Sequence, residues 1–172
     1  MIKDLKRSLA KVRISNAKRN SSILFEMPIA SAAVILSSNN IDQLPVFVEL
    51  SQSLNLKDSG IKIVLFKKKD ENFSEFDGLT FVEGDLSILG NFNNKELLEF
   101  TQNHIDLLIT FAEEDSLLLS LLTATCNAGL KVGNDTKYEK PLDVVIKSGD
   151  NAKLFASEVI KFLKQFKIKN DE

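Results

Sequence analysis

Asp106-Leu107-Leu108-Ile109-Thr110-Phe111 is the stretch that decides the fold, because it is a nearly continuous apolar run and not an alternation of apolar and polar residues. Two earlier stretches, Ser31–Leu36 and Ile61–Phe66, have the same character. A strand that is covered on one face alternates, whereas a strand of a parallel sheet is covered on both faces and is apolar throughout. The three runs therefore predict buried strands of a parallel sheet.

Helical patterns separate these strands, as expected when the crossover between two parallel strands contains a helix. The chain predicts such helices at about 43–54, 94–103, 116–127 and 151–167, and shorter strands at 79–82, 131–133 and 142–146. Gly129 is predicted to follow the third of these helices as its terminating glycine. With right-handed crossovers, the pattern predicts an α/β fold with a three-layer, mostly parallel, doubly wound (Rossmann-like) sheet.

The first 21 residues differ from the rest in charge. They hold seven basic residues against one acid, Asp4, a net +6 that leaves −8 for residues 22–172 of a chain whose formal charge is −2. We predict a basic amphipathic helical arm at 1–21, with its helix running from about Ile2 to Arg19, and a single α/β domain at 22–172. Four apolar residues at heptad-like spacing form a narrow stripe on this helix, namely Ile2, Leu5, Leu9 and Val12. The stripe packs either on the domain itself or on a partner.

Composition favours a reduced, cytoplasmic protein. The one cysteine, Cys126, has no second cysteine to pair with and lies in an apolar helical pattern, so we expect a buried thiol. The apolar stretch 27–36 follows a long, periodic basic segment that does not resemble the short charged start of a signal peptide. It is also far shorter than the roughly 20 residues that cross a bilayer. We therefore read it as a buried strand.

Most of the chain resembles an uncharacterised family of small α/β proteins of unknown function found in Bacteroidota. The resemblance is carried by Ile105–Ile109, by Lys131-Val132-Gly133, by Leu142–Ile146, by the closing Phe-rich helix and by the Lys-rich arm. It brings no established activity with it.

The chain also resembles, at the level of fold, the N-terminal domain of heptosyltransferase-type glycosyltransferases. In those enzymes a first strand ends in a Ser-Ser…Asp turn that leads into a helix, and Leu36–Pro45 is the similar stretch here. The turn lacks the family's glycine before the acid and is one residue longer. These 172 residues also do not include the second domain that binds the sugar nucleotide in those enzymes. The resemblance therefore implies the fold alone.

Polar residues that follow the strands are the candidate ligand-binding site, because ligands of open α/β sheets bind beyond the carboxyl ends of the strands. They are Ser37, Ser38, Asn40 and Asp42 after the first strand, and Glu113 and Glu114 after the third. Each acid also has a structural explanation: Asp42 is a candidate N-cap, and acids before a helix complement its dipole. The chain has no glycine-rich phosphate motif, and His104, its one histidine, falls at a predicted helix end. We predict no catalytic residues, no metal site and no cofactor.

The basic arm is the candidate partner-binding surface, through Lys3, Lys6, Arg7, Lys11, Arg13, Lys18 and Arg19. We expect a non-enzymatic accessory or docking protein that contacts RNA, a ribonucleoprotein or a protein assembly. A membrane surface is less favoured, because the arm has no aromatic side chain to insert. The alternative is a Rossmann-like enzyme or sensor that binds a nucleotide or sugar nucleotide at the carboxyl ends of the strands. A third reading makes the arm an ordinary surface helix of its own domain.

Overall fold

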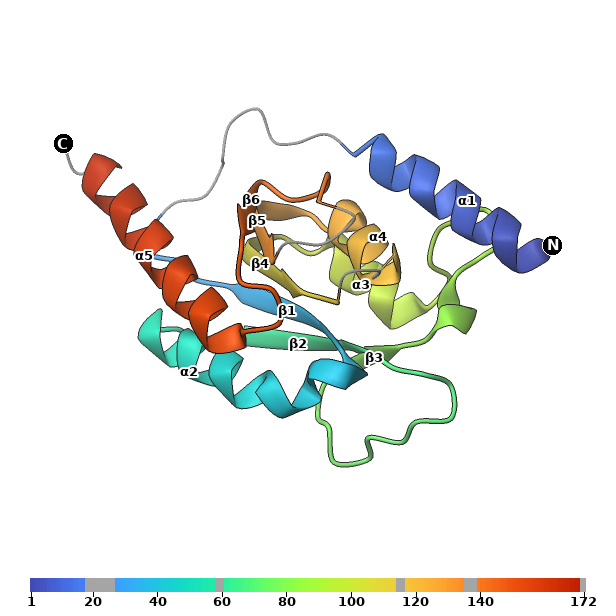
Figure 1. Ribbon diagram of the computed structural model, residues 1–172, viewed down its shortest axis with the longest axis horizontal. Coiled ribbons are helices and arrows are strands. Elements are labelled where there is room, and N and C mark those ends of the chain that lie inside the picture. The colour runs from blue at the N-terminus through green and yellow to red at the C-terminus, as the bar shows by residue number, and fades with distance from the viewer. Residues whose placement is uncertain (18–26, 58–60, 114–116, 135–138, 171–172) are drawn as a thin grey trace.

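One parallel sheet forms the centre of the computed structural model, which describes residues 1–17, 27–57, 61–113, 117–134 and 139–170 (Figure 1). In this part of the chain the sheet has six strands. They are β1 (Ala32–Ser37), β2 (Ile61–Phe66), β3 (Leu79–Phe81), β4 (Ile105–Phe111), β5 (Ala128–Asn134) and β6 (Val144–Ile146). The apolar runs thus form β1, β2 and β4, three neighbouring strands of the sheet; β1 and β4 are buried as predicted, whereas β2 is only partly buried.

The strand order is β3-β2-β1-β4-β5-β6, and each neighbouring pair is parallel. From β1 the chain builds outward to β2 and β3, and then returns to place β4 on the other side of β1. Ala32 pairs with Ile61 of β2 on one side and with Leu107 of β4 on the other. The doubly wound prediction is confirmed. The order reverses between β1 and β4, where folds of this kind bind ligands.

Helices cover both faces of the sheet. One face packs against α2 (Leu44–Ser53) and α5 (Ala152–Asn170), and the other against α3 (Lys95–Gln102) and α4 (Leu117–Thr125). The N-terminal helix α1 (Ile2–Ser15) lies outside this arrangement, against α4 (Figure 1). Two short 3₁₀ helices follow strands, η1 (Ser38–Gln43) after β1 and η2 (Glu83–Asp85) after β3.

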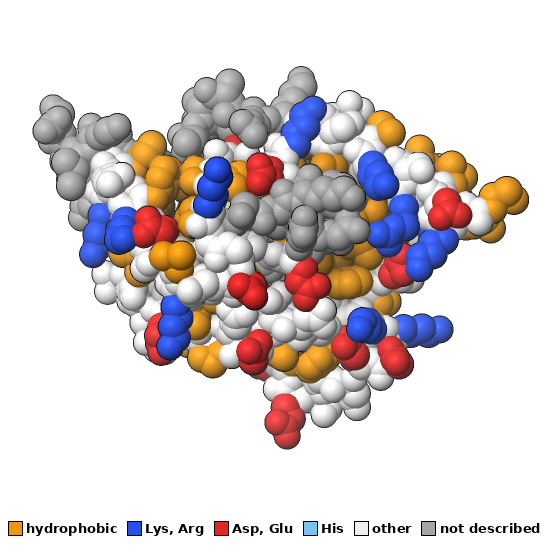
Figure 2. Space-filling model, in the orientation of Figure 1, with side chains coloured by type: hydrophobic (Ala, Val, Ile, Leu, Met, Phe, Trp, Pro, Cys, Tyr) orange, Lys and Arg blue, Asp and Glu red, His pale blue; other side chains and the backbone are white. Residues whose placement is uncertain are grey.

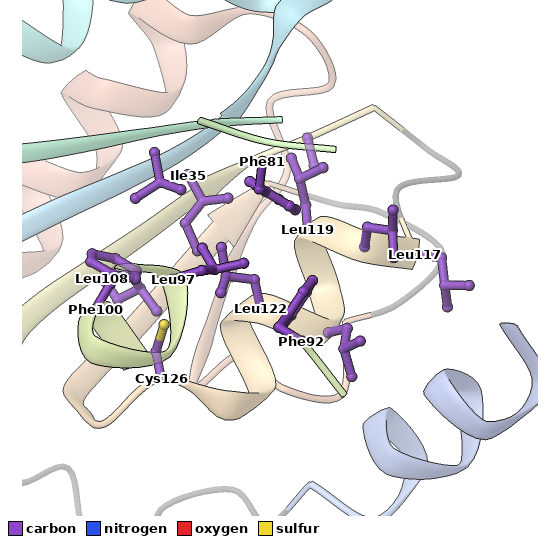
Figure 3. Packing of buried hydrophobic residues seen from close by; sticks show 14 of the residues in the cluster. Ile35, Phe81, Phe92, Leu97, Phe100, Leu108, Leu117, Leu119, Leu122 and Cys126 are labelled. Atoms are coloured by element: carbon purple, nitrogen blue, oxygen red, sulfur yellow. The ribbon is translucent and has the colours of Figure 1, made fainter. Parts of the chain in front are cut away.

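Phenylalanine supplies much of the core on both faces. Phe47, Phe111 and Phe155 meet under α2 and α5, with ring centroids 5.4–6.4 Å apart. On the other face, Phe81 and Phe92 pack edge to face at 5.7 Å among the leucines of α3 and α4 (Figure 3). Cys126 belongs to this second cluster. Burial raises the pKa of its thiol to about 12, so the buried-thiol prediction is confirmed.

Two local predictions are wrong. Asp42 does not cap α2, because the chain after β1 forms η1 and the N-cap position falls on Gln43. Gly129 does not terminate α4, since the strand pairing of β5 already includes Ala128 and Gly129 lies inside that strand. In the second case the connection between helix and strand is shorter than the sequence pattern indicates.

Two neighbouring residues of α5 test the aromatic core. Phe155 is fully buried, whereas Leu154 is 43% exposed. Phe155→Ala leaves a cavity between two helices and the sheet, so we expect it to lower the free energy of unfolding by about 3–5 kcal/mol. Leu154→Ala should change it by less than about 0.5 kcal/mol. Urea denaturation followed by circular dichroism measures both, and equal losses would contradict this packing.

Candidate functional site

Helix α1 is held on the body of the protein by a close backbone contact. Gly90 has a φ of +72°, and a Cβ atom there would lie only 2.7 Å from Cβ of Leu9 and 3.0 Å from the backbone nitrogen of Ala10. On the same side of the helix, Ala10 and Ile14 are buried. A larger residue than glycine would push the loop away from the helix. The segment 83–90 is therefore the seat of α1.

Basic side chains of α1 fasten the helix to this seat. Lys3 and Arg7 both pair with Glu83, with N–O distances of 3.1 and 3.0 Å. The Lys6 ammonium donates a hydrogen bond of 2.8 Å to the carbonyl oxygen of Leu86. These side chains thus bind their own domain, along the edge of the buried face of the helix.

The far end of α1 has two further contacts of this kind. Arg13 Nε donates to the carbonyl of Leu89 at 3.4 Å, a long hydrogen bond, and Lys140 donates to the carbonyl of Ser15. The helix is therefore fastened at both ends by charged donors and backbone acceptors.

Glu83 is half-buried beneath α1. Partial burial opposes the ionisation of its carboxyl group, but the hydrogen bonds from Lys3 and Arg7 outweigh it and lower the pKa below the ordinary value of 4.5. Glu83 is therefore charged at neutral pH and anchors both cations.

The seven predicted partner-binding residues thus divide into three groups. Lys3, Lys6, Arg7 and Arg13 contact the segment 83–89. Lys11 is exposed on the outer side of α1. Lys18 and Arg19 lie outside the described residues. The prediction that the helix reaches Arg19 is wrong, because α1 ends at Ser15 with Asn16 as its C-cap. The domain boundary after residue 21 stays a prediction.

The predicted apolar stripe of α1 faces outward. Ile2 is 61%, Leu5 51% and Val12 53% exposed, and only Leu9 is half-buried. The reading in which this stripe packs on its own domain is therefore wrong, because the buried face is the one that carries Ala10 and Ile14. Figure 2 shows hydrophobic side chains, with Lys and Arg around them, at the end of the molecule where Figure 1 places α1.

The predicted ligand-binding residues meet where β1 and β4 end. Ser37 donates to the side-chain oxygen of the buried Asn40 at 3.1 Å, within the turn that starts η1. Asn39 reaches from this turn to the Glu113 carboxylate at 2.6 Å. The residues predicted from the sequence include Asn40, whose side chain holds the turn, but not Asn39.

The other three predicted ligand-binding residues are placed differently. Ser38 lies beside them and hydrogen-bonds to Glu71, which helps to lower the pKa of that carboxyl group. Asp42 falls within η1, and Glu114 lies outside the described residues.

Two adjoining hollows open at this edge of the sheet. The smaller, of about 210 Å³, lies at the ends of β1 and β4 and includes Ser37, Ser38, Asn39 and Glu113. The larger, of about 460 Å³, lies between α1 and the end of β2. Both are lined by Arg7, Phe66, Lys68 and Glu83.

Sequence reasoning missed part of the larger hollow. Lys67-Lys68-Lys69 follows β2 directly and reads as an ordinary polar strand end. The fold brings this run beside the basic residues of α1, some 60 positions away in the chain. The sequence signal that could have pointed to this hollow was the run of three consecutive lysines at the carboxyl end of β2.

At the opposite edge of the sheet, His104 pairs with Asp106 at 3.3 Å. The other oxygen of Asp106 accepts hydrogen bonds from the backbone N–H groups of Ala30 and Ser31. Partial burial raises the pKa of Asp106, but these backbone hydrogen bonds outweigh it and lower the pKa. The hydrogen bonds of Asp106 attach the residues that precede β1 to the start of β4. Among the described residues, no three His, Cys, Asp or Glu side chains gather as a metal site would require.

The chain belongs to a family of unknown function (DUF6913), whose model matches residues 2–166. No curated protein matches it, and no solved structure does. The match includes α1, so the helix is part of the family's common sequence and not an addition to it. Within the described residues, no helix has the length and apolar character needed to cross a membrane.

Replacing Glu83 tests how α1 is fastened. Near neutral pH we expect Glu83→Gln to lower the free energy of unfolding by about 1 kcal/mol, because two partly exposed ion pairs are lost. The pKa of Glu83 is lowered in the folded protein, so this contribution is present above its ordinary value of 4.5 and is lost as the pH falls through the lowered pKa. The difference between the two proteins should therefore close in acid, as urea denaturation over a pH series would measure.

Glu99→Gln is the matched control, since Glu99 faces Lys95 at 3.9 Å on the exposed side of α3. It should cost no more than about 0.5 kcal/mol. A difference between wild type and Glu83→Gln that persists unchanged in acid would contradict the assignment to the Glu83 charge.

Proposed function

We propose that the protein is a non-enzymatic docking protein that binds an acidic, amphipathic helix of a partner protein along the outward face of α1. The observation that supports this most is where the exposed large apolar side chains lie. In the part of the chain described, most of them are on α1 and the adjoining loop: Met1, Ile2, Leu5, Val12, Ile88 and Leu89. Contiguous exposed apolar surface marks interaction sites.

The spacing of this surface suits a helical partner. Ile2, Leu5, Leu9 and Val12 are separated by three, four and three residues, which is the seam spacing of helices that pack side by side. The segment 83–90 adds to this apolar surface, because the exposed Leu89 lies next to Arg13, whose Nε donates to the Leu89 carbonyl. Gly90 lies against the helix at Leu9 and Ala10, and the side that carries Ala10 and Ile14 is buried, so the seam faces away from the domain.

The charge of α1 indicates which class of partner binds this seam. Lys11 and Arg13 are exposed on α1, which contains one acid, Asp4. A second copy of this chain would bring like charges together, and an acidic helix would bring opposite ones. RNA offers phosphates but no apolar face for Ile2, Leu5 and Val12. A partner protein therefore suits the surface better than RNA.

We further propose that the protein is cytoplasmic, on its composition and N-terminal sequence, and that it comes from Bacteroidota, on its resemblance to a family from that group. The likeness of its sheet to a glycosyltransferase half-domain concerns the scaffold and supplies no activity.

A photo-crosslinking residue at position 12 tests the proposal in cells. We expect it to capture a protein whose crosslinked segment is an acidic amphipathic helix, while the same residue at Val48, exposed on α2, does not. A synthetic peptide of that segment should bind the purified protein, more weakly as salt is added. Leu5→Gln with Val12→Gln should weaken it at least about tenfold, since two apolar anchors are lost.

Val48→Gln with Leu154→Gln is the matched control, because it removes two exposed apolar side chains from α2 and α5 and should leave binding unchanged. Equal crosslinking at positions 12 and 48 would contradict the proposal. Capture of RNA at position 12 would also contradict it. A third contradicting result is that no protein is captured and that the protein binds anionic lipid vesicles in a way that Leu5→Gln with Val12→Gln abolishes.

A further inference from the structure

We infer that the larger hollow, between α1 and the end of β2, binds a phosphate-bearing small molecule of nucleotide size. This site lies on the edge of α1 that faces the domain, and the docking seam lies on its outer face. Ile2 belongs to both, but the inference does not rest on the proposed function, because it is argued from the basic residues of the hollow.

The hollow is strongly basic. Its lining contains six cations and one acid, which are Lys3, Lys6, Arg7, Lys67, Lys68 and Lys69 with Glu83. Because Glu83 offsets a single charge, a net positive charge remains around a cavity of about 460 Å³, which is within the size range of small-molecule sites. Charge of one sign inside a cleft concentrates ligands of the opposite sign.

Several of these cations are positioned before any ligand arrives. Arg7 and Lys3 are held by Glu83, and Lys6 by the carbonyl of Leu86. On the β2 side, the Lys67 ammonium donates to the carbonyl of Glu71 at 2.9 Å.

The turn after β2 is fixed in a similar way, since the Lys68 backbone N–H donates to the Glu71 carboxylate at 2.8 Å. The exposed ammonium groups of Lys68 and Lys69 project from this braced turn. They are the groups best placed to contact a phosphate.

The smaller hollow supplies a polar extension. It shares Arg7, Phe66, Lys68 and Glu83 with the basic hollow and continues to the turn after β1. Asn39 and Glu113 meet there at 2.6 Å. A carboxylate accepts hydrogen bonds from sugar hydroxyls and repels phosphate, so the phosphates lie in the basic hollow and the sugar lies toward Glu113.

Phosphate recognition here uses side chains. The turn after β1 contains no glycine, so it cannot form the backbone cradle of the nucleotide-binding motifs. Instead, a lysine side chain binds phosphate through its compact positive charge, and an arginine side chain binds it through a planar set of hydrogen-bond donors. We therefore expect affinity that falls steadily with added salt.

Inorganic pyrophosphate and ADP are the probes. At about a hundred times its dissociation constant, each should raise the melting temperature by about 5 °C or more. ADP should bind more tightly than pyrophosphate, because its ribose reaches the smaller hollow. Lys68→Ala with Lys69→Ala should weaken both at least tenfold, and Asn39→Ala should weaken ADP alone. Titration calorimetry gives the affinities.

Lys153→Ala with Lys164→Ala removes the same charge from the exposed side of α5 and should leave both affinities unchanged. Leu5→Gln with Val12→Gln should also leave them unchanged, which separates this site from the docking seam. The site would be overturned if neither probe raised the melting temperature, or if the α5 control lost as much affinity as Lys68→Ala with Lys69→Ala. A short RNA that outcompetes ADP would overturn it too. ADP that binds no more tightly than pyrophosphate would overturn its nucleotide size.

Discussion

The close approach of Gly90 to the backbone of Leu9 and Ala10 is the contact on which the functional surfaces depend. A helix with five basic residues and a narrow apolar stripe has no strong preference for one orientation on a surface. The glycine and the small side chain of Ala10 let the loop lie directly against one side of the helix. That contact turns Ile2, Leu5 and Val12 outward and points Lys3, Lys6 and Arg7 toward the end of β2.

The same helix therefore contributes to two surfaces of different chemistry. Its outer face is apolar with basic margins, and its inner edge completes a basic hollow beside the point where the strand order reverses. Glu83 holds Lys3 and Arg7 by its charge and lines both hollows. A ligand that competes for these cations would act on the seat of α1 as well. The two surfaces are neighbours in structure and share Ile2, while Leu5 and Val12 belong to the outer face and Lys68 and Lys69 to the hollow.

The sheet was predictable and the orientation of α1 was not. Apolar runs such as Ala32–Leu36 mark strands that are covered on both faces, and that signal is local. The stripe of α1 is also local, but which neighbour it meets depends on the loop at Gly90, far along the chain. A heptad stripe is compatible with a core and with a partner, so Ile2 and Leu5 were ambiguous in principle. Lys67–Lys69 gained their role only through the strand order, which places them beside α1.

Amide hydrogen exchange of α1 in wild-type protein and in Gly90→Ala tests the central claim most directly. An alanine at this φ is strained, and its Cβ atom would meet Leu9. We predict that the α1 amides are protected in the wild type and lose protection in Gly90→Ala, while β1 and β4 stay protected in both. Rapid exchange of α1 in the wild type, or unchanged protection of α1 in Gly90→Ala, would contradict the account.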